Sequence, residues 1–259
     1  MSTTRAIILA AGRGSRMHSL TQDRPKCLVE LGGRPLLEWQ LNALRVGGIS
    51  DILVVTGYMG HKLSGNFKTL ENPDWATSNM VTTLTKANQW LREGPTLIAY
   101  SDILYRPEHV RALACADGDL AMTYDTLWRE LWGLRFEDPL SDAETFRQEG
   151  GILREIGAHT DSYADIQGQY MGLLKCTPAG WERVHGILSG LGSEGVAGLD
   201  VTALFKMLLS HGVAIQTIPV KGGWCEADSG DDLAQYEEKL KEADAGLAWS
   251  HDFRVGYGG

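Results

Sequence analysis

Short runs of apolar residues alternate along the chain with longer stretches in which apolar residues recur every three or four positions. The short runs are continuous, as in strands buried on both faces of a parallel sheet, and they occur at 6–10, 52–55, 96–100 and 120–123. Helical spacing occurs between them at 36–45 and 79–92. Strands that alternate with helices predict an α/β fold with a single doubly wound, mostly parallel sheet, in which ligands bind at the carboxyl ends of the strands.

The pattern changes at residues 126–176, where aromatic and charged residues are dense and short alternating pieces indicate strands. We interpret this stretch as a small β-rich insertion, a lid or acceptor-binding region, within one domain of residues 1–245. Beyond it we expect helices at 178–189 and 200–210, a strand at 213–220, and a last helix from about residue 229 onward. The Gly-ended tail at 246–259 is expected to fray.

Composition supports a packed globular protein and excludes several kinds of partner. The 259 residues are 43% apolar and 22% charged, and the net charge of −9 disfavours a nucleic-acid or anionic-membrane surface. No segment approaches the roughly 18 apolar residues of a membrane span, and the four cysteines form no C-x-x-C pair. We therefore predict a soluble, cytoplasmic protein without structural zinc or disulfides.

One segment departs from the acidic character of the chain. Residues 5–34 hold six basic and two acidic side chains, a net charge of +4, while the remaining residues carry −13. Directly after the first predicted strand comes the string Leu9-Ala10-Ala11-Gly12-Arg13-Gly14-Ser15-Arg16-Met17. Its two glycines let backbone N–H groups approach a phosphate chain, and its arginines add charge that does not titrate. The segment therefore suggests a site for a small anion.

Two common phosphate loops do not fit this string. A dinucleotide-binding G-x-G-x-x-G loop would need a glycine where Met17 stands, and the P-loop string is absent. Downstream, Lys26 follows Pro25, which restricts the backbone. One ammonium there could stabilise the negative charge that a phosphoryl group gains during in-line displacement.

The string at 9–17, followed by Pro25-Lys26-x-Leu28, resembles the signature of nucleotidyltransferases, which join a nucleoside triphosphate to a small phosphorylated compound and release pyrophosphate. Further strings resemble the branch that contains phosphocholine and phosphonate cytidylyltransferases; they lie at 79–84, 100–104, 138–146, 169–174, 200–202 and 224–228. The matches span about residues 5 to 240. The resemblance implies a Rossmann-like sheet of the nucleotidyltransferase or GT-A type.

The resemblance also implies roles for individual residues. The base and the phosphates would be held by Leu9, Ala10, Ala11, Gly12, Arg13 and Gly14. Arg16 would contact the β- and γ-phosphates, and Lys26 the α-phosphate. Asn79, Thr83 and Ser101 would lie at the nucleotide. Relatives that use sugar phosphates show a Gly-Thr-Ala string near Asn79, and its absence here argues against a sugar-1-phosphate acceptor.

Asp102 and Asp228 are implied as Mg²⁺ ligands, and the sequence offers an independent argument. Asp102 follows a predicted strand and stands too early to cap a helix that begins at Pro107. Ser229 is the better cap for the last helix, which leaves Asp228 without a structural role. Two carboxylates, phosphate oxygens and waters suit octahedral Mg²⁺. The attacking oxygen of a phosphate or phosphonate is already anionic near neutral pH, so no histidine is required as a base.

The acceptor pocket is open to several interpretations. Four aromatic residues and one acid, Trp128, Trp132, Tyr170, Trp224 and Glu226, could cage a quaternary or primary ammonium, or the aromatic residues could belong to the core. The basic residues Arg129, Arg135 and Lys175 would instead suit an acceptor with an extra carboxylate. Phosphocholine, 2-aminoethylphosphonate and a carboxylated phosphonate therefore remain open as acceptors.

These observations predict a Mg²⁺-dependent cytidylyltransferase. It would transfer CMP from CTP to a small phosphonate or phosphomonoester. Phosphonate natural-product or cell-surface pathways would be its setting, and a homodimer would be compatible with this prediction. A sugar-1-phosphate nucleotidyltransferase that uses UTP or another triphosphate is one alternative, and a non-catalytic nucleotide-binding regulator is another. A glycosyltransferase is disfavoured because the Asp-x-Asp string at 117–119 precedes a predicted strand instead of ending one.

Overall fold

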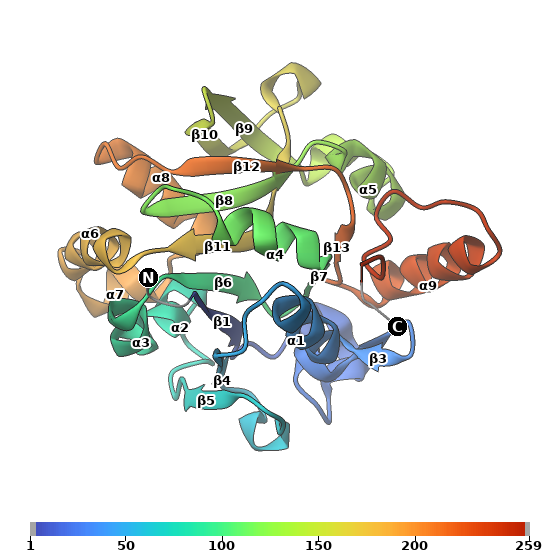
Figure 1. The fold of residues 1–259 in the computed structure, drawn as a ribbon, viewed down its shortest axis with the longest axis horizontal. Helices are drawn as coiled ribbons and strands as arrows, with labels where there is room; N and C mark the ends of the chain where they lie inside the picture. The colour runs from blue at the N-terminus through green and yellow to red at the C-terminus, as the bar shows by residue number, and fades with distance from the viewer. Residues whose placement is uncertain (1–3, 257–259) are drawn as a thin grey trace.

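The computed structural model describes residues 4–256 as an α/β protein built on one nine-stranded sheet (Figure 1). The strand order is β5-β4-β1-β6-β11-β8-β12-β10-β9. The strands are β1 (Arg5–Ala10), β4 (Ile52–Thr56), β5 (Lys68–Glu71), β6 (Thr96–Tyr100), β8 (Leu120–Asp125), β9 (Glu144–Glu149), β10 (Ile152–His159), β11 (Gln169–Cys176) and β12 (Gln216–Val220). β5, β4, β1 and β6 run parallel, as do β12 and β8, whereas β11 is antiparallel to both neighbours. The predicted α/β fold is confirmed.

Helices cover both faces of the sheet because its central strands are apolar on both faces. Alternate residues of β1 face two separate hydrophobic clusters: Ile8 belongs to one and Ile7 to the other, and both are fully buried. The first cluster is covered by α1 (Leu36–Val46), α4 (Pro107–Ala114), α5 (Trp128–Arg135) and α9 (Gly230–Asp244). The second is covered by α2 (Met80–Lys86), α3 (Asn88–Glu93), α6 (Pro178–Ser189), α7 (Gly192–Ala197) and α8 (Val201–Ser210).

Local sequence signals set several helix ends as predicted. Pro107 is the first residue of α4, and Ser229 caps α9 in a capping box with Asp232. The single helix expected at 79–92 was wrong, because Ala87 has a ψ of 19° and separates α2 from α3. Asn88 begins α3, and its side chain accepts a hydrogen bond from Trp181 Nε1 of α6 at 2.8 Å.

The stretch at 126–176 does not form a separate layer. It contains α5 and three strands, and all three strands join the main sheet. β9 and β10 extend one edge, whereas β11 lies between β6 and β8. Its residues 171–176 are all buried, so the pattern located a strand but did not show its central place.

The expectation that the tail frays was wrong for residues 249–254. The Phe253 ring packs edge-on against Trp39, with ring centroids 5.2 Å apart, and both Phe253 and His251 are fully buried. His251 Nε2 lies 2.9 Å from the buried Asp125 Oδ2. Aromatic burial and the contact between His251 and Asp125 thus fix this segment, while the final glycines at 258–259 lie outside the described residues.

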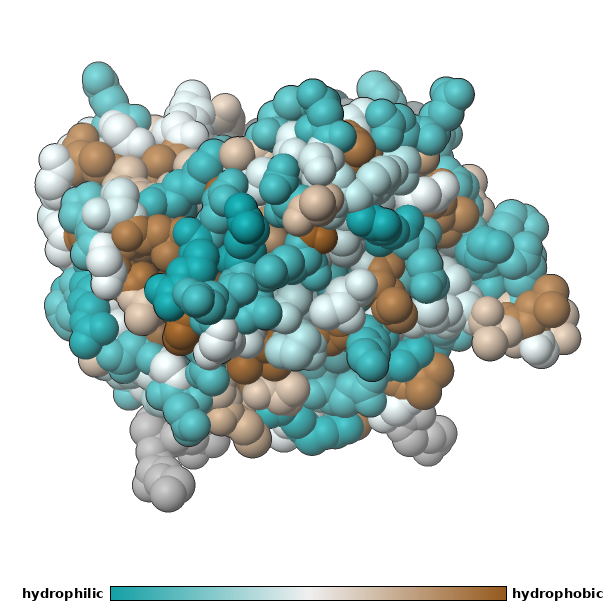
Figure 2. Space-filling view, turned by 90° about the horizontal axis from the view of Figure 1, so that it is seen from above, coloured by the Kyte–Doolittle hydropathy of each residue, from teal (hydrophilic) through white to brown (hydrophobic). Residues whose placement is uncertain are grey.

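Two short strand pairs lie outside the main sheet. β7 (Ile103–Tyr105) pairs antiparallel with β13 (Trp224–Glu226), and β2 (Glu30–Leu31) pairs with β3 (Arg34–Pro35). Short 3-10 helices lie at η1 (Ser15–Thr21), η2 (Lys26–Leu28), η3 (Gly60–Lys62), η4 (Pro139–Ser141) and η5 (Tyr163–Asp165). In the view of Figure 2, hydrophilic side chains cover most of the surface and hydrophobic ones form small separate groups. Among residues 4–256, no helix combines the length and hydrophobicity that a bilayer crossing requires.

Candidate active site

The glycine-rich loop after β1 turns directly against Lys26. Gly14 has a φ of +72°, a left-handed conformation that L side chains rarely adopt. A Cβ atom added to Gly14 would stand 2.8 Å from the side chain of Lys26, so only glycine allows this close approach. Pro25 caps η2, which begins at Lys26 and directs the lysine under the loop.

Three carboxylates from distant parts of the chain meet beside Lys26. Asp102 lies between β6 and β7, Glu226 ends β13, and Asp228 follows two residues later. The pairing of β7 with β13 brings them together, and the N–H of Ala227 donates to the carbonyl of Asp102 at 2.9 Å. One oxygen from each carboxylate lies within 4.8 Å of the others. The two aspartates expected as metal ligands are therefore neighbours, and Glu226 joins them.

The donor set of this carboxylate cluster fits Mg²⁺. Carboxylate oxygens are ligands that this cation prefers, with waters and phosphate oxygens completing an octahedron. Asp102 Oδ1 is buried and has no hydrogen-bond partner among the residues that the structure describes. A buried carboxylate oxygen without a partner is costly, and a cation would satisfy it.

Lys26 is the main counter-ion of the cluster. Its Nζ lies 2.7 Å from Asp102 Oδ2 and 2.7 Å from Asp228 Oδ1, and the residue is only 7% exposed. Burial by itself lowers the pKa of Lys26, but the two carboxylates outweigh it and raise this pKa above its usual range. Arg16 Nη2 adds a contact of 3.0 Å to Asp228 Oδ1. The Lys26 ammonium therefore stays charged at the site.

Arg135 closes the cluster from the side of α5. Its guanidinium donates to Glu226, Asp228 and Asp232, each at 3.2 Å, and its side chain is 3% exposed. Burial and the nearby carboxylates raise the pKa of Glu226 to about 8, although Arg135 and Lys26 oppose the shift. The sequence offered Arg135 as a contact for an acceptor carboxylate, but the structure uses it to neutralise acids of the protein.

The other two basic candidates for an acceptor carboxylate also lie elsewhere. Lys175 Nζ donates to the carbonyl of Ala114 at 3.0 Å and to that of Ala116, near the far end of β11. The Arg129 guanidinium stands over the ring of Tyr163, 4.1 Å from its centroid. Neither side chain reaches the carboxylate cluster.

Two adjoining clefts meet at the cluster. The loop cleft has a volume of about 240 Å³ and is lined by Leu9, Gly12, Gly14, Ser15, Arg16, Lys26, Met80, Tyr100, Ser101, Asp102 and Asp228. The inner cleft has a volume of about 300 Å³ and is lined by Arg16, Met80, Tyr100, Trp132, Asp142, Glu144, Thr145, Phe146, Ile156, Gln169, Tyr170, Met171, Gly172, Asp200, Thr202, Glu226 and Asp228. The two clefts share Arg16, Met80, Tyr100 and Asp228.

Most residues expected at the phosphates line the loop cleft, but several others have structural positions. Ala10 and Ala11 are buried beneath the loop, and the Arg13 guanidinium lies 5.5 Å from the centroid of the Tyr58 ring. Asn79 caps α2 and accepts from the N–H of Met80 at 2.7 Å. Thr83 is buried, and its hydroxyl accepts a hydrogen bond from Asn72 Nδ2 at 3.0 Å. Neither Asn79 nor Thr83 lines the clefts.

The aromatic candidates divide between cleft and core. Tyr170 and Trp132 line the inner cleft, together with Glu226. Trp128 and Trp224 are 2% and 1% exposed and pack within the hydrophobic core, so the structure does not place them at the cleft. Cleft residues that sequence reasoning missed include Met80, Asp142, Glu144 and Asp200. The strings at 138–146 and 200–202 pointed to their neighbourhood, but nothing in the pattern said which side chains turn inward.

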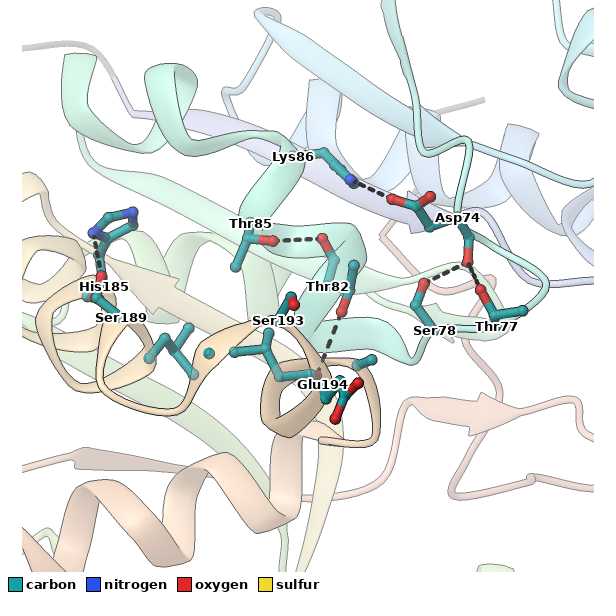
Figure 3. Close-up of a pocket in the computed structure, with 14 residues that line it drawn as sticks. Asp74, Thr77, Ser78, Thr82, Thr85, Lys86, His185, Ser189, Ser193 and Glu194 are labelled. Carbon is teal, nitrogen blue, oxygen red and sulfur yellow. Dashed lines mark hydrogen bonds and ion pairs between the residues drawn. The ribbon is translucent and has the colours of Figure 1, made fainter.

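A hollow larger than either cleft lies away from this chemistry. A groove of about 740 Å³ runs between α2, α6 and α7 (Figure 3). Its polar side chains are mostly satisfied by neighbours: Lys86 Nζ lies 2.7 Å from Asp74 Oδ2, and the Thr85 hydroxyl donates to the carbonyl of Thr82. The groove contains neither the glycine loop nor the carboxylate cluster, so the two clefts are the better candidate site.

Known proteins are similar to this chain in sequence and in fold. Residues 6–159 match the family described as the MobA-like NTP transferase domain. A CTP:phosphoglutamine cytidylyltransferase from Campylobacter jejuni is 32% identical over 251 residues, covering 90% of this chain and 99% of that protein. A 2-aminoethylphosphonate cytidylyltransferase from Lancefieldella rimae is 34% identical over 113 residues, 41% of this chain and 46% of its own. The structure of the CTP:phosphocholine cytidylyltransferase from Streptococcus pneumoniae matches with a TM-score of 0.71 at 19% identity, covering 92% of this chain and all of that one.

Proposed function

The chain belongs to the family of MobA-like NTP transferase domains, and we propose that it is a cytidylyltransferase. It transfers CMP from CTP to the phosphate or phosphonate of a small acceptor and releases pyrophosphate. The observation that carries the proposal is the carboxylate cluster with Lys26 between two of its members, set where a glycine loop and two clefts meet. The cytidylyltransferases among its relatives support CTP as the donor.

In this proposal the chain's own residues neutralise and align two anions. An acceptor oxygen attacks the α-phosphorus, the bond to the β-phosphate oxygen breaks, and pyrophosphate leaves. Asp102, Asp228 and Glu226 would hold Mg²⁺, which supplies positive charge to the triphosphate when bound. Arg16 and the loop amides lie where they can bind phosphate oxygens. Lys26 would stabilise charge on the α-phosphate; one unit charge pair at 4 Å is worth about 4 kcal/mol at an effective dielectric of 20.

The reaction needs no general base from the protein. The second pKa of a phosphate ester is about 6, so the attacking oxygen is already deprotonated near neutral pH. Within residues 4–256, no histidine lines either cleft.

The test is pyrophosphate release from each nucleoside triphosphate with a panel of small phosphonates, phosphomonoesters and sugar phosphates, with Mg²⁺ or with EDTA. We expect turnover with CTP, Mg²⁺ and a non-sugar acceptor. Asp102→Asn and Asp228→Asn should each lower turnover by at least about 100-fold, while circular dichroism shows an intact fold. Asp161→Asn is the matched control, because that side chain is 96% exposed. Turnover like the wild type in either variant would remove that aspartate from the mechanism.

A further inference from the structure

Building on the proposed function, we infer that the acceptor carries an ammonium group with N–H bonds at the end opposite its phosphate or phosphonate. Three acids of the inner cleft, Asp142, Glu144 and Asp200, bind this ammonium, and Glu144 is the residue that determines the specificity. The inference narrows the acceptor to a primary or secondary amine and excludes a quaternary ammonium and a carboxylate at this end.

The three acids come from three elements and converge on one cleft. Asp142 follows η4, Glu144 begins β9, and Asp200 caps α8. The Oδ2 atom of Asp142 accepts from Trp132 Nε1 at 3.1 Å, and Asp200 Oδ1 accepts from the N–H of Ala203 at 2.7 Å. Each of these two carboxylates keeps a second oxygen for a ligand. Asp142, Glu144 and Asp200 form no ion pair within residues 4–256.

The cleft is therefore short of positive charge at this end. Burial raises the pKa of Glu144, the negative charges of Asp200 and Asp142 add to the shift, and Lys206 opposes it. Lys206 itself donates to the carbonyl of Gly157 at 2.6 Å. At the other end of the cleft, Arg16 is the one basic residue among the described lining residues. Glu226 and Asp228 also line the cleft near Arg16, but Arg135 and Lys26 neutralise them. An acceptor with an anion toward Arg16 and a cation toward Glu144 matches the charges that remain.

A second feature of the cleft suits a ligand that donates hydrogen bonds. The Tyr170 hydroxyl is buried beside that of Tyr100, which is near enough to share a hydrogen bond with it, and it has no other hydrogen-bond partner within residues 4–256. Tyr170 lines the same cleft as the three acids. A ligand with N–H donors could donate a hydrogen bond to this oxygen in addition to those it donates to the carboxylates.

The aromatic rings of the cleft do not form an open cage. Phe146 stacks on Tyr124, with centroids 4.7 Å apart, and Tyr170 meets Phe205 edge-on at 5.3 Å. The Trp132 ring already has the Arg135 guanidinium 5.5 Å from its centroid. A quaternary ammonium depends on open aromatic faces and donates no hydrogen bond, whereas an N–H ammonium donates directly to carboxylates. The site therefore favours an ammonium that keeps its hydrogens.

The experiment compares acceptors of similar shape by calorimetry and by pyrophosphate release. 2-Aminoethylphosphonate, n-propylphosphonate and phosphocholine are titrated into the protein with Mg²⁺ and a non-hydrolysable CTP analogue. We expect 2-aminoethylphosphonate to bind at least tenfold more tightly than each of the other two. Glu144→Gln should reduce this preference at least fivefold by raising KM for the amine with little change in kcat. Glu149→Gln, on the exposed end of the same strand, should leave the preference unchanged.

Each outcome bears on a separate claim. Equal binding of the amine and n-propylphosphonate, or tighter binding of phosphocholine, overturns the inference. If CMP is nevertheless transferred to those acceptors, the proposed function stands and only the inference about the ammonium fails. If no acceptor receives CMP, the proposed function fails, while the calorimetric preference still decides the inference. Should Glu144→Gln fail to fold, Asp200→Asn replaces it, because asparagine keeps the cap of α8.

Discussion

Replacing Lys26 with Met removes a positive charge from between two buried carboxylates and keeps an unbranched side chain that is only one atom shorter. At an effective dielectric of 20, each contact of 2.7 Å is worth about 6 kcal/mol of gross attraction, most of which offsets the cost of burying the charges. Breaking a buried pair by removing one partner typically costs about 3–5 kcal/mol. Arg16 and Arg135 still contact Asp228 in the variant, so we expect a loss near the lower end, about 3 kcal/mol.

Mg²⁺ should change the stability of Lys26→Met and that of the wild type by different amounts. A divalent cation at the carboxylate cluster would take over the counter-ion role of the missing ammonium, whereas in the wild type it competes with Lys26. We therefore expect millimolar Mg²⁺ to raise the free energy of unfolding more in Lys26→Met than in the wild type. CMP transfer should fall by at least about 100-fold with Mg²⁺ present, because the α-phosphate loses its ammonium.

The assay is urea unfolding followed by tryptophan fluorescence, with EDTA and with Mg²⁺. Lys68→Met serves as the control, since the Lys68 side chain is 62% exposed and its ion pair with Asp51 lies at the surface. It should change stability by less than about 0.5 kcal/mol. The reasoning is refuted if Lys26→Met unfolds within about 0.5 kcal/mol of the wild type in EDTA, or if Mg²⁺ stabilises both proteins equally.

Three further predictions concern the loop and two buried histidines. Gly14→Ala forces a left-handed alanine against Lys26 and should lower CMP transfer at least about tenfold. Gly33→Ala is the control, because Gly33 has a similar φ of +74° and no atom within 4 Å; it should lose about 1 kcal/mol of stability but keep its turnover. Equal turnover in both variants would contradict this prediction. Burial, with a neighbouring arginine, lowers the pKa of His109 to about 4 from 6.5. As the pH falls, the unfolded chain binds a proton at His109 before the folded protein does. Neutral His109 therefore contributes about 3 kcal/mol to the free energy of unfolding above pH 6.5, and this contribution is lost as the pH falls toward 4. In His109→Gln, the urea midpoint should change less across that pH range. His251→Ala removes a side-chain partner of the buried Asp125, which keeps the N–H donors of Leu127 and Gly222. This loss should cost about 2 kcal/mol in thermal unfolding, and a loss below about 1 kcal/mol would show that the contact does not hold the tail.

Much of the fold could be predicted from the sequence because it follows from local patterns. Apolar runs such as 6–10 and 52–55 became strands buried on both faces, and helical spacing became helices. Capping logic also separated Ser229 from Asp228: the serine caps α9, and the aspartate lies in the carboxylate cluster. These inferences needed only residues within a few positions of one another, where backbone hydrogen bonding and side-chain spacing are fixed by the chain itself.

The tertiary structure decided which charges meet and which rings are covered. Asp102 and Glu226 become neighbours only through the pairing of β7 with β13, and Arg135 joins them from a helix on another segment. The same holds for the acids that converge on the inner cleft, which lie on three separate elements. A tryptophan in a core and a tryptophan in a binding cleft have the same local pattern, because burial is a property of the neighbours that folding supplies. Local sequence therefore determined the elements and the glycine loop, and non-local packing alone determined the electrostatics of the site.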